Sequence, residues 1–417
     1  MKILSIILLL SVSSVELFAQ TNNSPYSIFG IGDIEDSYYN RTTGMANTGL
    51  AYRSANFMTL NNPASLSALG THYIAGEIAG RGTIINYYGA GVNQNYNQSS
   101  DITFKKVIIG TKPTNHWGTS AGLVPYSSQN YEFNNPQPIL GALNENTTAY
   151  YQGNGGLNKV YWANSYDFFN HVSVGVEAAY LFGSVAQKII LLDPNGNEIV
   201  STNNTTNMTN GTLTYGLQYY TGIGKKWDVS IGGTFSNKTN LLAKTTQIVL
   251  APDSSQLYVA PKTESYFAIP TTYGVGIAIT RNKKYTLVAD YKFQNWSALN
   301  YSGYNYILTN SSRYSVGFEI SKQKTLINNL LYETSFFQFG FYYNKSYVQV
   351  FDQQLKDIGG SIGVGINSKH GVSYTISFQY GVKGIENTQL LQQRYGSLTF
   401  IVSLRDALYN TRKVRFL

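Results

Sequence analysis

The sequence has no cysteine, few charged residues and no long apolar segment. Without cysteine, the folded chain contains neither a disulfide nor a thiolate metal site. Charged residues make up 12% of the chain, about half of the roughly 25% usual in soluble proteins. After the N-terminus, no segment offers the roughly eighteen consecutive apolar residues of a transmembrane helix. We therefore expect neither a disulfide-stabilised domain nor a helical membrane protein.

The N-terminus has the pattern of a secretory signal. Lys2 precedes the mostly apolar segment 3–10, and small residues follow up to Ala19. We place the cleavage site after Ala19, so that residues 1–19 form a signal peptide. A membrane anchor is the less favoured alternative, because the apolar segment is too short to cross a bilayer.

The rest of the chain shows a two-residue periodicity, which is typical of β-strands. In 171–183 and 372–382, apolar and polar or small residues alternate along the chain. A soluble sandwich would show the same alternation. Small polar faces, together with aromatic residues near the ends of the apolar faces, favour a membrane barrel instead.

Counting the alternating segments predicts an all-β fold, a transmembrane antiparallel β-barrel of about 14 strands over 71–404. An even number of strands is expected of bacterial single-chain barrels. The expected strands are 71–87, 101–111, 116–127, 149–165, 171–190, 212–222, 227–249, 267–280, 285–298, 312–321, 333–347, 358–366, 372–382 and 391–404.

The connections between these segments differ in length and charge. Long polar connections, such as 191–211, alternate with short ones, such as 281–284. Long outer loops and short periplasmic turns are typical of barrels. The short connections are mostly basic, with Lys112, Lys225, Lys226, Arg281, Lys283, Lys284, Lys322, Lys324 and Lys369. Basic turns beside anionic lipid headgroups would explain much of the net charge of +8 without nucleic acid.

Two segments lie outside the expected strands. Residues 20–70 precede the first strand, are rich in Gly, Asn and Ser and show little sustained alternation. The tail 405–417 is basic and should be periplasmic, because it follows the last strand.

Part of segment 20–70 resembles a known family. The residues Gly44-Met45-Ala46-Asn47-Thr48-Gly49-Leu50-Ala51 and then Asn61-Asn62-Pro63-Ala64-Ser65-Leu66 resemble the N-terminal signature of FadL/TodX outer-membrane transporters. The resemblance implies a fourteen-stranded barrel with an N-terminal hatch, whose motif would here be Asn62, Pro63 and Ala64. The segments 24–33 and 153–158 are similar to those of FadL-type proteins from Bacteroidetes-like bacteria.

The resemblance implies a bacterial outer-membrane protein that takes up small hydrophobic compounds, fatty-acid-like or aromatic. Its expected partners are membrane lipids and a hydrophobic small-molecule ligand, with no nucleic acid. The alternative is a non-transporting barrel subunit of an outer-membrane protein export or assembly complex. Some relatives with this fold have that role, and the sequence does not separate the two functions.

Two groups of residues are candidates for function. Glu177, Asp290, Lys292 and Glu319 fall on polar strand faces, where they would line a path or fill the lumen with salt bridges. Pro125 cannot donate to a β-ladder, so it would mark a break or kink in the third strand, with Gly122 giving the backbone room. In FadL-like proteins a kink in this strand opens a lateral exit. A proline just past the membrane rim is the alternative.

We expect no enzyme, no cofactor and no metal site. The pattern G-x-S-x-G occurs around Ser120 and Ser361, but neither serine sits between a buried parallel strand and a helix. The histidines show no metal-ligand spacing and fall near strand ends or turns, at His72, His116, His171 and His370.

Overall fold

The computed structural model describes residues 24–35, 38–89, 92, 97–138, 146–303, 305–325, 331–368, 371–386 and 390–407. The predicted signal peptide, His370 and the tail from residue 408 lie outside these ranges. The last strand reaches Ala407, so the first three residues of the predicted tail, 405–407, are strand. None of the described helices has the length and apolar character needed to cross a membrane.

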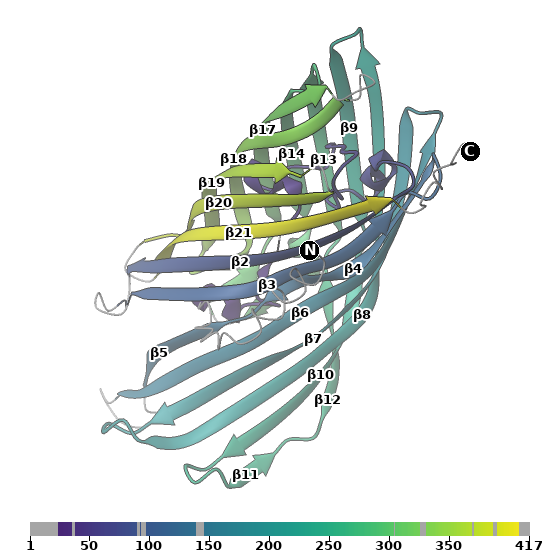
Figure 1. Cartoon of the computed structure of the whole chain (residues 1–417). Coiled ribbons are helices and arrows are strands. Elements are labelled where there is room, and N and C mark those ends of the chain that lie inside the picture. Colours follow the sequence, from purple (N-terminus) through teal and green to yellow (C-terminus); the bar gives the residue numbers. More distant parts are fainter. Residues whose placement is uncertain are drawn as a thin grey trace, which may run out of the picture.

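The described strands form a closed antiparallel barrel with fourteen positions around its wall, as predicted (Figure 1). The wall closes where β2 (Tyr73–Gly89) pairs along its whole length with β21 (Leu391–Ala407). Three positions are each made by two consecutive strands. The wall is built by β2, β3 (Gln98–Thr111), β4 and β5 (Trp117–Ser128, Tyr131–Pro138), β6 (Asn146–Phe168), β7 (Val172–Leu192), β8 (Glu198–Ile223), β9 and β10 (Trp227–Ser236, Thr239–Leu250), β12 and β13 (Thr263–Ile269, Thr272–Arg281), β14 (Tyr285–Gln294), β17 (Ser311–Thr325), β18 (Leu331–Val350), β19 (Gln353–Asn367), β20 (Val372–Gly384) and β21.

Shorter elements lie outside this ladder. Four are 3-10 helices, and the others are short strands in connections or in the N-terminal segment. They are η2 (Pro25–Ile28), β1 (Asp33–Ile34), η3 (Arg41–Met45), η4 (Pro63–Ala68), β11 (Gln256–Val259), η6 (Trp296–Leu299), β15 (Ser302–Gly303) and β16 (Tyr306–Leu308).

The predicted alternation sets the two faces of the wall. On β7, Val174, Val176 and Tyr180 are exposed on the outside, whereas Ser173 and Glu177 are buried inside. Each strand therefore presents apolar residues outward and small or polar residues to the lumen, as a lipid-embedded barrel requires.

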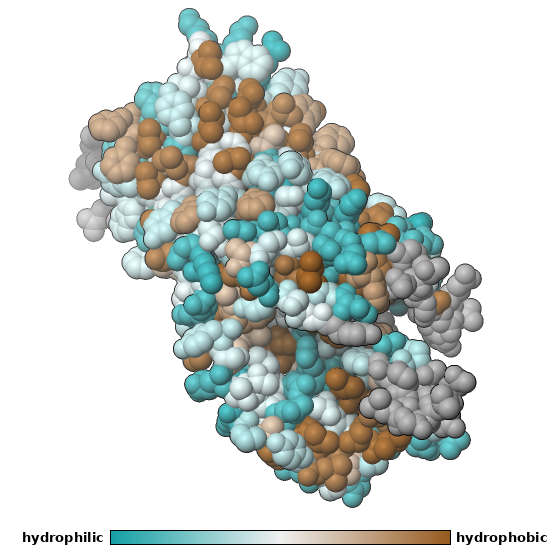
Figure 2. All heavy atoms as spheres, turned by 180° about the vertical axis from the view of Figure 1, so that it is seen from behind, coloured by the Kyte–Doolittle hydropathy of each residue, from teal (hydrophilic) through white to brown (hydrophobic). Residues whose placement is uncertain are grey.

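Exposed aromatic residues form two rings around the outer surface. One lies near the short turns and the other about one membrane thickness away; on β9 they are marked by Trp227 and Phe235, eight residues apart. This spacing is close to the 9–11 residues of a tilted membrane strand. Figure 2 shows hydrophobic residues gathered over the upper part of the molecule, above a more hydrophilic zone. The first ring contains Trp117, Tyr166, Tyr219, Trp227, Tyr285 and Tyr374, and the second Tyr180, Tyr215, Phe235, Tyr273, Tyr314 and Tyr380.

The long connections were predicted as loops, but much of several of them, such as 191–211 and 348–357, continues as strand. The segment 191–211 contains only a tight turn around Asp193–Asn197, and β8 already begins at Glu198. The polar residues of this part of β8 pair with β7 on one side and with β10 on the other. Backbone hydrogen bonds to neighbouring strands stabilise these polar extensions, which do not need an apolar face. The extensions therefore lack the apolar alternation from which the strands were predicted.

The N-terminal segment, in its described residues 24–35 and 38–69, packs inside the barrel. Helix η3 contacts β17, β18, β19 and β20, whereas η4 contacts β4, β6, β7 and β8, on another part of the wall. Met45, Leu50 and Leu66 are completely buried. Thus one short segment bridges distant strands through the lumen.

One of the predicted basic turn residues faces the N-terminal segment instead of lipid. Lys112 is buried, and its ammonium donates to the carbonyl of Ser67 in η4. Lys225 and Lys226, by contrast, are exposed at their turn, where a basic side chain can meet a headgroup.

Candidate functional site

The residues Asn62, Pro63 and Ala64 attach the N-terminal segment to the wall. The Asn62 amide accepts from the N–H of Ala64 at 3.0 Å and thereby caps η4, since Asn is a preferred N-cap residue. It also donates to the carbonyls of Leu50 and Leu217, at 2.9 and 3.1 Å. The predicted motif therefore joins a helix start, a loop of the same segment and β8 through a single side chain.

Glycines on the wall permit this close approach. A Cβ at Gly175 of β7 would overlap the backbone of Ala64, and one at Gly216 of β8 would overlap Asn62 and Pro63. Only residues without a side chain let the motif lie directly against these two strands.

Asp290, predicted to line the lumen, binds the same segment. Its carboxylate on β14 accepts from the backbone N–H groups of Gly49 and Leu50, at 2.6 and 3.0 Å. Lys292, two residues further along the inner face of β14, is half-buried and pairs in register with Arg313 of β17. Asp290 thus serves as an anchor for the segment rather than as a free lumen charge.

Glu319 belongs to the largest ionic cluster described in the lumen. Arg41 of η3 binds Glu319 through Nε and Nη2, at 2.9 and 2.8 Å, and Glu333 of β18 through Nη1 at 2.7 Å. The guanidinium also lies 3.9 Å from the ring centre of Phe336. Burial opposes the charge on Arg41, but the two carboxylates outweigh it and raise the pKa of Arg41 well above its usual range.

Glu177 forms a further ion pair at the lumen wall. Lys159 of β6 lies 2.8 Å from the Glu177 carboxylate, and the hydroxyl of Tyr38 donates to the same carboxylate at 3.1 and 3.2 Å. All three predicted acidic residues, Glu177, Asp290 and Glu319, are therefore buried and engaged with the N-terminal segment.

The wall is interrupted between β3 and β4. Their ladder contains only five pairs and ends where Val107 faces Leu123. Gly122 lies within this paired part, with its backbone close to Ile108. Pro125 lies two residues beyond the last pair, and its pairing with β6 shifts register between Pro125 and Ser127. The strands therefore separate at the height of Pro125.

The N-terminal segment enters this interruption. Strand β1 pairs with β4 through Asp33–Ser128 and Ile34–Ser127, and the N–H of Glu35 donates to the carbonyl of Tyr126 at 3.0 Å. On the other side, the Glu35 carboxylate binds Lys105 of β3 at 2.5 Å. Residues 33–35 thus connect the two strands that have separated.

The charge of Glu35 is stabilised by basic neighbours. Burial alone would raise its pKa, but Lys105 and Arg81 outweigh this effect and lower the pKa of Glu35 to about 2. Lys105 faces inward because a β-bulge places it between Phe104, opposite Gly80, and Lys106, opposite Ala79. This inward lysine was not predicted, although the pair Lys105-Lys106 breaks the two-residue alternation and so marks the bulge in the sequence.

A cavity of about 470 Å³ adjoins the interruption. Its wall includes Ile102 of β3 and Ser128 of β4, from the two sides of the separated strands. Ile102 is 61% exposed on the outer surface. Ile102 therefore lies between the cavity and the outer surface. Its charged lining residues include Asp33, Glu35, Arg81, Lys105, Asp357 and Lys383.

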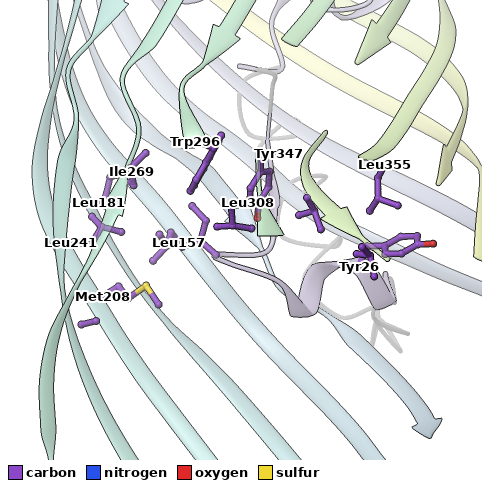
Figure 3. Close-up of a cluster of buried hydrophobic side chains, with 14 of the residues drawn as sticks. Tyr26, Leu157, Leu181, Met208, Leu241, Ile269, Trp296, Leu308, Tyr347 and Leu355 are labelled. Carbon is purple, nitrogen blue, oxygen red and sulfur yellow. The ribbon is translucent and has the colours of Figure 1, made fainter. Parts of the chain in front are cut away.

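An apolar cluster lies at the inner face of the wall, toward the long connections. Figure 3 shows Leu181, Leu241 and Ile269, from β7, β10 and β12, on the same side as the ring of Trp296. The rings of Trp296 and Tyr347 stack with centroids 4.5 Å apart. This cluster was not predicted, because Trp296 and Tyr347 lie in segments that were interpreted as strand ends without a shared apolar face.

The serines of both G-x-S-x-G patterns bind backbone or structural groups. Ser120 donates to the carbonyl of Ile109 at 2.9 Å, and Ser361 donates to that of Gly44 at 2.9 Å. His116 and His171 lie at turns, as predicted, with Nδ1 of each near a backbone carbonyl at 3.1 Å. Both serines and both histidines therefore have backbone partners.

Comparison with known proteins supports the fold. The toluene transporter TbuX of Ralstonia pickettii is 14% identical, with a TM-score of 0.57 over 89% of this chain and 98% of its own. A FadL homologue of Pseudomonas aeruginosa is 12% identical, with a TM-score of 0.58 over 88% and 98%. The toluene transporter TodX of Pseudomonas putida is 14% identical, with a TM-score of 0.55 over 91% and 100%. No curated protein matches the chain. A family model described as BamG matches residues 1–415.

Proposed function

The chain belongs to the BamG family, and we propose that it is a bacterial outer-membrane channel for small hydrophobic compounds, fatty-acid-like or aromatic. The family name differs from the FadL/TodX resemblance of the sequence, whereas the barrel architecture is shared with those transporters. The similarity of 24–33 to FadL-type proteins supports an origin in Bacteroidetes-like bacteria.

The observation that carries this proposal is the cavity at the interruption between β3 and β4. Its lining runs from charged residues of the lumen to Ile102 on the outer surface. An apolar solute crosses the polar outer leaflet poorly, but its free energy falls when it moves from water into the hydrocarbon core. A sideways exit near Pro125 would release it there directly.

The N-terminal segment would act as the hatch. Residues 33–35 fill the interruption, and Asn62, Asp290 and Arg41 fasten the rest of the segment to the wall. We propose that the segment 33–35 moves aside when a solute passes, while the remainder stays in place. Lipids of both leaflets are then the permanent partners of the outer face, and the tail 405–417 lies in the periplasm.

Two similar structures are toluene transporters by name. At 14% identity they support the architecture of a transporter but not its ligand.

The alternative is a non-transporting subunit of an outer-membrane export or assembly complex. One observation favours it: the buried ion pairs of Arg41 with Glu319 and Glu333, and the hydrogen bond of Tyr38 to Glu177, hold the N-terminal segment firmly against the wall. A barrel used only as a scaffold would need such a rigid filling. Transport in turn needs only the small segment 33–35 to move.

Uptake of a labelled aromatic hydrocarbon by cells tests the transport proposal. Ile102→Trp should fill the outer mouth of the cavity and slow uptake. Ile109→Trp is the matched control, because Ile109 is on the same strand and 53% exposed, yet lies in the paired part of β3. Equal uptake by the two variants would contradict the lateral route.

Mass spectrometry of the purified wild-type protein separates the two functions. Bound lipid-like or aromatic molecules would support the channel. Stable co-purification with a much larger membrane protein, with no such ligand and no uptake, would support the subunit.

A further inference from the structure

Beyond the second aromatic ring, part of the wall projects as a sheet with two free edges (Figure 1). It contains β5, β6, β7, β8, β10 and β12. In the part of the chain that the structure describes, β5 pairs only with β6 and β12 pairs only with β10. The edge of β12 is open because β14 ends at Gln294 and the chain turns into η6 instead of continuing beside it.

The direction of the backbone groups at this edge follows from one hydrogen bond. The N–H of Ala268 donates to the hydroxyl of Tyr301 at 2.6 Å, so it points away from β10. Backbone groups point alternately to the two sides of a strand, so those of Tyr266 and Glu264 point the same way. Among the described residues, nothing pairs with them.

The two edges of the projecting sheet differ in protection. Native proteins block free edges with prolines, charges or covering segments. β5 carries Pro136 and Pro138, which have no N–H to offer. β12 has no proline, and Tyr266 on its outer face is 70% exposed. Its one charged residue, Glu264, lies 2.8 Å from Lys244 of β10.

We propose that β12 binds an extended strand of another polypeptide, added antiparallel along Thr263–Phe267. Every pair in this barrel is antiparallel, and the open N–H and C=O groups of Glu264 and Tyr266 offer the matching hydrogen bonds. An aromatic or β-branched residue of the partner would face Tyr266, since such cross-strand pairs are favourable.

A second copy of this chain does not fit the edge. Two copies inserted in one membrane would run β12 in the same direction, which excludes an antiparallel β12–β12 ladder. The other free edge, β5, runs opposite to β12, but Pro136 and Pro138 leave it without backbone donors at two positions. The partner is therefore a different chain, exposed on the side of the membrane opposite the short turns. This inference holds whether or not the barrel transports a solute.

Photocrosslinking of the full-length protein in its native membrane tests the proposal. Benzoylphenylalanine would replace Tyr266 in one variant and Glu264 in another, and mass spectrometry would map the adducts. We expect both positions to reach one partner segment, at residues about two apart and in reversed order, the signature of an antiparallel strand. Adducts only to lipid, to a second copy or to scattered residues, or no adduct at all, would overturn the proposal.

A backbone variant then separates strand addition from a side-chain contact. With the crosslinker at position 266, Glu264→Pro removes one outward N–H but leaves the ladder bonds of Thr263 and Ser265 to β10. Glu264→Ala is the matched control, because it keeps the N–H and loses the charge. We expect about a three- to tenfold loss of adduct for the proline variant alone, the effect of one hydrogen bond. An equal loss in both variants would assign the contact to the Glu264 side chain and overturn strand addition. Migration of the unboiled barrel on a gel checks the folding of both.

Discussion

Arg41 and Glu319 form a two-pronged ion pair inside the barrel, although 278 residues separate them in sequence. Their side chains are only 2% and 3% exposed. Glu333 completes the cluster, so one guanidinium bridges two carboxylates. The pair fixes η3 against the strands of one side of the wall.

Replacing Arg41 should loosen this attachment. Arg41→Met leaves Glu319 and Glu333 buried without a cation, which costs about 3–5 kcal/mol in comparable buried pairs. We expect a lower unfolding temperature of the barrel and faster proteolysis of the N-terminal segment. Lys244→Met, which removes an exposed ion pair with Glu264, should change neither. Similar behaviour of the two variants would contradict a structural role of the cluster.

Removing the N-terminal segment should open the lumen. Deletion of 21–60 takes away Arg41, Leu50 and the segment 33–35, which together cross the barrel. Single-channel conductance and sensitivity of cells to antibiotics should then rise. Unchanged conductance from a correctly folded barrel would mean that other elements close the lumen.

Glu35 should control the opening between β3 and β4. Glu35→Gln keeps the backbone bond to Tyr126 but removes the charge that binds Lys105, so uptake of a hydrophobic solute should increase. Because the pKa of Glu35 is lowered to about 2, the wild-type ion pair is complete above about pH 4.5 and is lost only as the pH falls toward 2. Wild-type uptake should therefore be constant between about pH 5 and 8, and a pronounced change in this window would exclude Glu35 as the control.

Pro125 should keep the two strands apart. Pro125→Val restores a backbone donor just beyond the last pair, Val107–Leu123. We expect the ladder to lengthen and uptake to slow, while unboiled gel migration stays normal. Normal uptake by this variant would place Pro125 in the rim without a role in release.

Cysteine labelling tests the orientation of the barrel. The chain has no native cysteine, so an introduced thiol reports alone. Cysteines at Asn195 and Asn305 should react with a membrane-impermeant reagent on intact cells, whereas those at Asn282 and Ser368 should not. The opposite pattern would invert the orientation.

The sequence was sufficient for the wall because lipid imposes its pattern directly. Along β7 and β20, every outward position must be apolar, so the alternation marks each strand. The sequence was insufficient for the projecting sheet. There β8 carries the mostly polar residues 203–210, and polar residues on either face of the strand can contact water. In the projecting sheet the structure depends on the pairing of strands, and this pairing leaves no pattern in the sequence of a single strand.

The sequence predicts which residues face the lumen but not which residues they contact. Parity predicts Glu177, Asp290 and Glu319 on inner faces, and all three are buried. Their partners Lys159, Leu50 and Arg41 could not be inferred, since each contact depends on the path of a segment without periodicity. The β-bulge at Lys105 was missed for a different reason: the pair Lys105-Lys106 marks it in the sequence, but it breaks the parity on which the prediction relied.

The contacts of the N-terminal segment also constrain the order in which the barrel forms. This segment is synthesised first, yet Glu319, Glu333 and Ser361, which bind it, belong to some of the last strands. Contacts at such sequence separations form slowly, because a long loop must close first. Once β2 has paired with β21, the wall is closed at the level of the membrane apart from the interruption between β3 and β4, which residues 33–35 fill. We therefore expect the barrel to close around an N-terminal segment that already lies inside it. The residues that fill the finished lumen then also serve as the template on which the last strands assemble.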